Sequence, residues 1–115
     1  MVSRGTEKRG YPAYALSRIR ELARQGKVRY LSARAQHDIE NLGYEPDDIH
    51  ECLANLEESD FDHAETYLDF PGWYDVYHVV LVSTQGHRDR PYIKLRLTRD
   101  VMYVELRSFH VDRWL

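Results

Sequence analysis

Two alternating runs near the C-terminus carry side chains that could bind RNA. Tyr92, Lys94 and Arg96 alternate with apolar residues, and Tyr103 and Arg107 hold the equivalent positions of the next run. Side chains alternate across a strand, so these five are expected on the solvent face of one hairpin. Tyrosine rings stack on bases and cations hold phosphates, which suits single-stranded RNA. We therefore expect Lys94, Arg96 and Tyr103 to bind substrate. The alternative is that tyrosine and arginine are simply common on exposed strands.

The same face could also cleave a phosphodiester. Cleavage without a metal needs a base for the 2′-hydroxyl, cations for the charge that develops on phosphorus, and an acid for the leaving oxygen. Histidine is the side chain best suited to proton transfer near neutral pH. His63 and His78 fall in expected strands. By alternation, His78 points inward and is expected to be packed rather than catalytic.

Metal, disulfide and membrane chemistry find little support in the sequence. The single cysteine, Cys52, excludes an intramolecular disulfide and a multi-cysteine zinc site. The segments His37–Asp38 and His50–Cys52 hold metal-ligand types without a recognised metal-site spacing. No apolar run approaches membrane-spanning length, and the N-terminus has no hydrophobic block. We expect a cytoplasmic domain that binds no metal or cofactor.

Charge is distributed in three blocks. Residues 37–75 contain thirteen Asp and Glu and no Lys or Arg. Residues 1–36 contain nine Lys and Arg against two Glu, and residues 76–115 contain seven against four acidic residues. Separate fields of this kind would steer a polyanion to the basic parts while the acidic middle faces elsewhere or meets a basic protein. The alternative is that the blocks interleave in the fold and neutralise one another.

Helices are expected first along the chain and strands afterwards. Helical spacing covers residues 13–25, and Ser32 begins a second helix that ends at Leu42. A third helix begins at Pro46, since proline is tolerated in a first turn. A short strand is expected over Lys27–Leu31, between the first two helices.

The second half changes to the period of two that is typical of strands. This order predicts an α+β domain with N-terminal helices packed on one face of a C-terminal antiparallel sheet. Residues 1–12 are expected to be a flexible lead, and residues 13–115 to form a single domain. The expected strands are Phe61–Tyr67, Trp73–Val82, Pro91–Thr98 and Val101–Phe109, with a tight turn at Arg99–Asp100 and an exposed loop over Ser83–Arg90.

The stretch from Leu16 to Arg107 resembles the MqsR family, the mRNA-cleaving toxins of bacterial type II toxin–antitoxin modules, which are related in fold to RelE. The pair formed by Glu-Ser-Asp-Phe and Trp-x-Asp-Val-Tyr is the most distinctive, and the order and spacing of all segments agree. The resemblance implies a RelE-like fold. The segments that carry it are IRELARQGKVR from Ile19, LEESDF from Leu56, WYDVY from Trp73, YIKL from Tyr92 and DV from Asp100.

The resemblance implies a toxin that cleaves mRNA without a metal and without the ribosome, at short sites that contain GC, and so inhibits translation and growth. It also implies an antitoxin similar to MqsA, with a zinc-binding N-terminal half and a helix-turn-helix C-terminal half. The zinc would belong to that partner, and operator DNA would be bound only through it. The alternative is a catalytically weak relative that acts as a binding module for antitoxin or RNA.

The catalytic set implied by the resemblance is Tyr92, His63, Tyr74 and Arg107. Only Tyr92 is identical to the family residue, since the family has lysine, glutamine and lysine at the other three positions. We expect His63 to act as general base or acid, and Arg107 and Lys94 to hold the phosphate. Tyr92 would position the substrate or protonate the leaving oxygen, and Tyr74 would keep a hydroxyl and add a ring for stacking.

The histidine at the end of the last strand is a reserve candidate. RelE-like toxins often place a catalytic residue near the C-terminus, where this chain has His110. Strand alternation puts His110 on the same inward face as Leu106, so we expect it to be packed or to lie in the tail.

Overall fold

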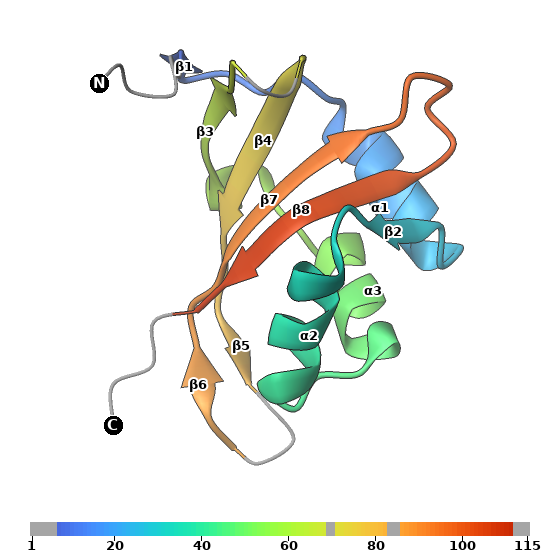
Figure 1. The fold of residues 1–115 in the computed structure, drawn as a ribbon, viewed down its shortest axis with the longest axis vertical. Coiled ribbons are helices and arrows are strands. Elements are labelled where there is room, and N and C mark those ends of the chain that lie inside the picture. Colours follow the sequence, from blue (N-terminus) through green and yellow to red (C-terminus); the bar gives the residue numbers. More distant parts are fainter. Residues whose placement is uncertain (1–6, 69–70, 83–85, 112–115) are drawn as a thin grey trace.

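The computed structural model describes residues 7–68, 71–82 and 86–111. Within them, three helices precede most of the strands, as the sequence predicts (Figure 1). None of these helices is long and apolar enough to cross a membrane. The elements are β1 (Lys8–Arg9), α1 (Leu16–Arg24), β2 (Val28–Tyr30), α2 (Ala33–Asn41), α3 (Pro46–Ala54), a 3₁₀ turn (Glu58–Asp60), β3 (Phe61–Thr66), β4 (Trp73–His78), β5 (Leu81–Val82), β6 (Arg88–Asp89), β7 (Tyr92–Leu97) and β8 (Val104–His110).

The main sheet has the strand order β1-β3-β4-β7-β8-β2. All neighbours are antiparallel except β2, which lies parallel to β8. The expected α+β class is confirmed, and the parallel edge strand is an addition to it. Lys8 and Arg9 pair with β3, so the segment expected to be a flexible lead contributes an edge strand.

The three helices form where local signals predict them. The Ser32 side chain accepts a hydrogen bond from the backbone N–H of Ala35, at 3.2 Å, and so caps α2. Gly26 and Gly43 follow α1 and α2 with φ of +70° and +88°, a region that glycine enters without steric cost. Pro46 is the first residue of α3.

The apolar core lies between the helices and one face of the sheet (Figure 1). Ile93, Leu95 and Leu97 of β7 point into it, as their alternation predicts. Helices α1 and α3 pack on each other and supply Ile19, Leu22, Ile49 and Leu53 to the same cluster. The polar residues of β7 therefore project from the opposite face.

The β7–β8 connection is longer than the expected two-residue turn. The Thr98 hydroxyl oxygen accepts hydrogen bonds from the backbone N–H of Met102 and of Tyr103, so β8 begins only at Val104. Val101 has a φ of 60°, and Met102 is 40% exposed. The expected strand Val101–Phe109 therefore begins three residues later than predicted, because Met102 belongs to the loop.

The expected strand Trp73–Val82 divides after His78. Its second part, β5, pairs with β6 in a separate two-stranded ribbon that extends beyond β4 and β7 (Figure 1). Strand β6 lies within the expected exposed loop, of which residues 83–85 lie outside the described residues. Asp89 of β6 is buried and accepts a hydrogen bond of 2.6 Å from the Tyr44 hydroxyl. The loop prediction is therefore wrong at these positions.

A β-bulge in β8 reverses the expected orientation of the last residues. The partners of Lys94 and Leu95 in β8 lie two positions apart, which leaves Arg107 as the extra residue. Beyond it, Phe109 is buried and His110 is exposed. The expectation that His110 points inward is wrong, because one inserted residue exchanges the two faces of a strand.

Candidate functional site

A groove of about 480 Å³ opens where the polar face of the sheet meets the start of α2. A hollow of about 410 Å³, lined by Tyr67, Tyr74 and Arg96, continues it and shares Lys94 and Arg107 with it. We call the two together the sheet groove. The titratable residues of its larger part include His63, Glu65, Tyr92, Lys94, Arg107 and His110.

Strand register explains why these side chains meet. His63 of β3 lies opposite Val76 of β4, Val76 opposite Lys94 of β7, and Lys94 opposite Ser108 of β8. Residues opposite each other in a ladder project from the same face. Glu65 projects from that face too, since it follows His63 by two positions.

The Glu65 carboxylate is the centre of the polar cluster. It is only 7% exposed. Its Oε1 lies 2.6 Å from His63 Nε2, and its Oε2 lies 2.7 Å from Lys94 Nζ. The Tyr67 hydroxyl donates a hydrogen bond to Oε2 and accepts one from Lys94. Burial alone would raise the pKa of Glu65, but the hydrogen bonds from Lys94, Tyr67 and His63 outweigh it and lower that pKa to about 2. Glu65 is therefore ionised at neutral pH.

His63 lies between two carboxylates. Its Nδ1 is 2.7 Å from Asp62 Oδ2, and its Nε2 faces Glu65. The Asp62 side chain is 45% exposed, whereas that of Glu65 is almost fully covered. A buried carboxylate can fix the orientation of an imidazole while the nitrogen beside solvent exchanges a proton. Nδ1 therefore faces the more exposed of the two carboxylates.

Tyr92 lines the groove and is exposed to solvent. Its side chain is 40% exposed, and its ring stacks on His78 with 4.0 Å between centroids and 9° between planes. His110 lies opposite Tyr92 in the β7–β8 ladder. His78 is partly exposed and its Nε2 lies 3.2 Å from the carbonyl of Arg90, so the prediction that it packs inward is wrong.

Arg107 extends over aromatic rings in the groove. Its guanidinium carbon is 4.3 Å from the centroid of the Tyr67 ring and 5.1 Å from that of Tyr74. Burial, followed by the hydrogen bond to Glu65, raises the pKa of Tyr67, so this ring keeps its hydroxyl proton. Stacking on aromatic rings fixes the orientation of the planar guanidinium, whose N–H donors point outward from its edge.

Tyr74 is completely buried beneath this cluster. Its hydroxyl accepts a hydrogen bond of 3.0 Å from Arg96 Nη1, and its ring meets Tyr67 edge to face. The expectation that its ring stacks on a base is therefore wrong. Arg96 is also paired, through Nε, with Glu105 at 2.9 Å. Both residues support the floor of the groove.

Tyr103 lies apart from the predicted site residues that line the sheet groove. It precedes β8 at the turn end of the hairpin, and the guanidinium carbon of Arg29 lies 3.5 Å from its ring centroid. Neither part of the sheet groove is lined by it. A role of Tyr103 in substrate binding remains a prediction.

Sequence reasoning missed Glu65, Tyr67 and the accessible position of His110. A signal for the first two existed, because they follow His63 by two and four positions in an expected strand. For His110 there was none, since the bulge that exposes it depends on pairing with β7.

Metal ligands do not gather in the part of the chain that the structure describes. No three His, Cys, Asp or Glu side chains there are arranged to hold a metal ion.

The chain matches the model of a known protein family. A protein-family model described as "Motility quorum-sensing regulator, toxin of MqsA" matches residues 11–110. A search among curated proteins found no match. The matched range includes every residue of the sheet groove.

Proposed function

Because the chain belongs to the MqsR toxin family, a family of toxin–antitoxin systems, we propose that it is an endoribonuclease that cleaves single-stranded mRNA without a metal ion. The observation that carries the proposal is the sheet groove, where His63, Tyr92 and Arg107 line one continuous hollow with Lys94. These are proton-transfer and phosphate-binding groups in one place. We expect cleavage at short sites, such as those that contain GC. The consequence of this cleavage would be arrest of translation and growth.

The proposed reaction is transfer of the phosphoryl group to the neighbouring 2′-hydroxyl. The 2′-oxygen loses its proton to a base and bonds to phosphorus, while the bond from phosphorus to the 5′-oxygen breaks. The 5′-oxygen takes up a proton from an acid. The products are a 2′,3′-cyclic phosphate and a 5′-hydroxyl, so no water and no cofactor is consumed.

His63 is the proposed proton-transfer residue. A hydrogen bond between Glu65 and Nε2 fixes the orientation of the imidazole. When RNA enters, the hydrogen bond between the exposed Asp62 carboxylate and Nδ1 is broken. Proton transfer by a positioned side chain accelerates a reaction by about 10²–10⁴-fold. Glu65 is then a positioning residue, because it acts through His63 and Lys94.

Arg107 and Lys94 are the proposed phosphate-binding cations. Arg107 presents a planar donor set, which suits two phosphate oxygens. Lys94 is already neutralised in part by Glu65, at 2.7 Å. We infer that the planar Arg107 guanidinium contacts two phosphate oxygens and that Lys94 adds charge beside it.

Tyr92 is the proposed contact to the leaving side of the phosphate. Its exposed side chain lines the groove, and its stacking on His78 limits rotation of the ring. A fixed phenol can donate a hydrogen bond to the 5′-oxygen or its proton. His110, opposite Tyr92 in the ladder, is the reserve acid.

An antitoxin partner follows from the family. We propose that it is similar to MqsA, that it holds its own zinc, and that operator DNA is bound only through it. Expression of the toxin alone should then arrest a bacterial host, and co-expression with the product of the neighbouring gene should restore growth.

The test is cleavage of a long single-stranded RNA by purified toxin in EDTA, with mapping of the cut ends. Wild type should cut at a short preferred sequence and leave 5′-hydroxyl ends. His63→Ala and Tyr92→Phe should each lose about 10²-fold or more in rate. The matched controls are His37→Ala and Tyr11→Phe, which change exposed residues outside the groove and should cut like wild type.

Two outcomes would contradict the proposal. If folded, antitoxin-free protein does not cut RNA, the chain is the binding module considered above. If it cuts but both groove variants stay within twofold of wild type, the activity is real and the assignment of His63 and Tyr92 is wrong.

A further inference from the structure

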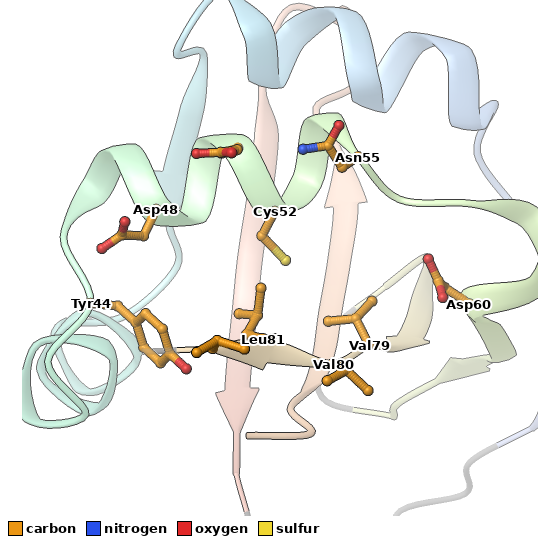
Figure 2. A pocket seen from close by; sticks show the side chains of 10 residues that line it. Tyr44, Asp48, Cys52, Asn55, Asp60, Val79, Val80 and Leu81 are labelled. Carbon is orange, nitrogen blue, oxygen red and sulfur yellow. The ribbon is translucent and has the colours of Figure 1, made fainter. Parts of the chain in front are cut away.

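A second groove, of about 510 Å³, lies between α3 and the segment that leads into β5. Figure 2 shows Asp48 and Cys52 of α3 on one side and Val80 with Leu81 on the other, while Asp60 lies at one end. We call it the acidic groove. No residue lines both this groove and the sheet groove.

One wall of the acidic groove is apolar and accessible. It is formed by the four consecutive residues 79–82. Val80 is 48% exposed and Val82 is 66% exposed, so two apolar side chains of this short segment contact water at a cost in free energy. Covering this wall would bury apolar surface that the described residues leave open.

The opposite wall carries negative charge. Asp48, Glu51 and Asp60 line the groove, and its lining contains no Lys or Arg. Among the described residues, none of the three forms an ion pair with a Lys or Arg. The whole of residues 37–75, from which these acids come, contains no Lys or Arg. Three of the thirteen acids of this block therefore lie together in the acidic groove, whereas Glu65 of the same block lies in the sheet groove.

We propose that the acidic groove binds a segment of the antitoxin in which Lys or Arg residues stand beside apolar side chains. Long cationic side chains lay their methylene groups on apolar surface and present the charge beyond it, which matches a valine wall facing carboxylates. RNA does not suit this surface, because carboxylates repel phosphates. The inference rests on the toxin assignment of the proposed function but not on RNA cleavage.

The test compares three variants in binding to the purified antitoxin encoded beside the toxin gene, by calorimetry. Glu51→Lys reverses a charge of the groove, and Val80→Asp adds charge to its apolar wall. The control is Glu40→Lys, the same change at an exposed position of α2 that does not line the groove. We expect Kd to rise about tenfold or more for both groove variants and to stay within about twofold for the control.

Salt dependence and peptide mapping sharpen the result. Added salt should weaken wild-type binding more than that of Glu51→Lys, since the charge contact is already lost in the variant. Short overlapping peptides that cover the antitoxin should bind only where the segment has a net positive charge. Binding of a net negative segment would overturn the proposal.

Three further measurements show why a variant binds the antitoxin less tightly. Near-UV circular dichroism must match wild type for each variant, and Glu51→Lys keeps the test valid if Val80→Asp fails to fold. Unchanged Kd in folded variants would overturn the proposal. So would self-association that Glu51→Lys abolishes without affecting antitoxin binding, because the groove would then serve a second copy of the chain. RNA cleavage should be equal in all variants, so its absence from wild type would contradict only the nuclease.

Discussion

Replacing Glu65 with glutamine tests the polar cluster most directly. Glutamine keeps the shape of the side chain and resembles the protonated carboxyl, but it removes the negative charge. In the structure this charge faces Lys94 Nζ at 2.7 Å and His63 Nε2 at 2.6 Å. Both partners have side chains only 22% exposed, so water replaces little of what is lost.

The magnitude follows from the shifted titration of Glu65. Its pKa is lowered from 4.5 to about 2, by hydrogen bonds that outweigh the effect of burial. A shift of this size corresponds to about 3 kcal/mol of unfolding free energy at neutral pH. Because the folded pKa is the lower one, this stability is present above the unfolded pKa and is lost as pH falls toward about 2.

The assay is urea unfolding of wild type and Glu65→Gln at about pH 7 and about pH 3. The variant should be less stable by about 3 kcal/mol at the higher pH and by less than half of that at the lower. The matched control is Asp62→Asn, which removes the exposed carboxylate beside His63 and should cost about 1 kcal/mol or less. A loss below about 0.5 kcal/mol at neutral pH, or an equal loss at both pH values, would refute the reasoning.

Three other predictions concern the framework. Asp75→Ala should lower the unfolding free energy by about 3 kcal/mol in urea unfolding, because the N–H groups of Ala13 and Tyr14 lose their carboxylate acceptor; a cost below about 1 kcal/mol would contradict this. Ser32→Ala should cost about 1 kcal/mol in thermal unfolding and Ser32→Gly only a few tenths, whereas equal costs would rule out the cap. Burial, followed by the nearby Asp60 charge, raises the pKa of Cys52 to about 12, so native protein should resist iodoacetamide at about pH 8 while urea-unfolded protein reacts, as mass spectrometry would show; equal rates would refute this.

Local patterns were enough for much of the fold. The cap at Ser32 and the proline that starts α3 act within a few residues, and the alternation of Ile93, Leu95 and Leu97 needs only the strand period. The same period placed Lys94 and Arg96 on the polar face. The family resemblance also came from short segments in a fixed order.

The assembled site depended on contacts between distant segments. Tyr74 is buried because Tyr67, Arg96 and Arg107, from three other parts of the chain, cover it. Glu65 acquires its role from Lys94, which is brought beside it by the order of the strands. No propensity of a single segment contains this information.

The sequence by itself determined the helices, the two faces of β7 and the kinds of chemistry available in the chain. Only the tertiary structure decided which side chains share a groove. Pairing between β7 and β8 made Arg107 a bulge and turned His110 outward, and folding placed Asp48, Glu51 and Asp60 beside the exposed valines. The reason is physical: strand register and burial are properties of pairs of segments, whereas periodicity and capping belong to one segment alone.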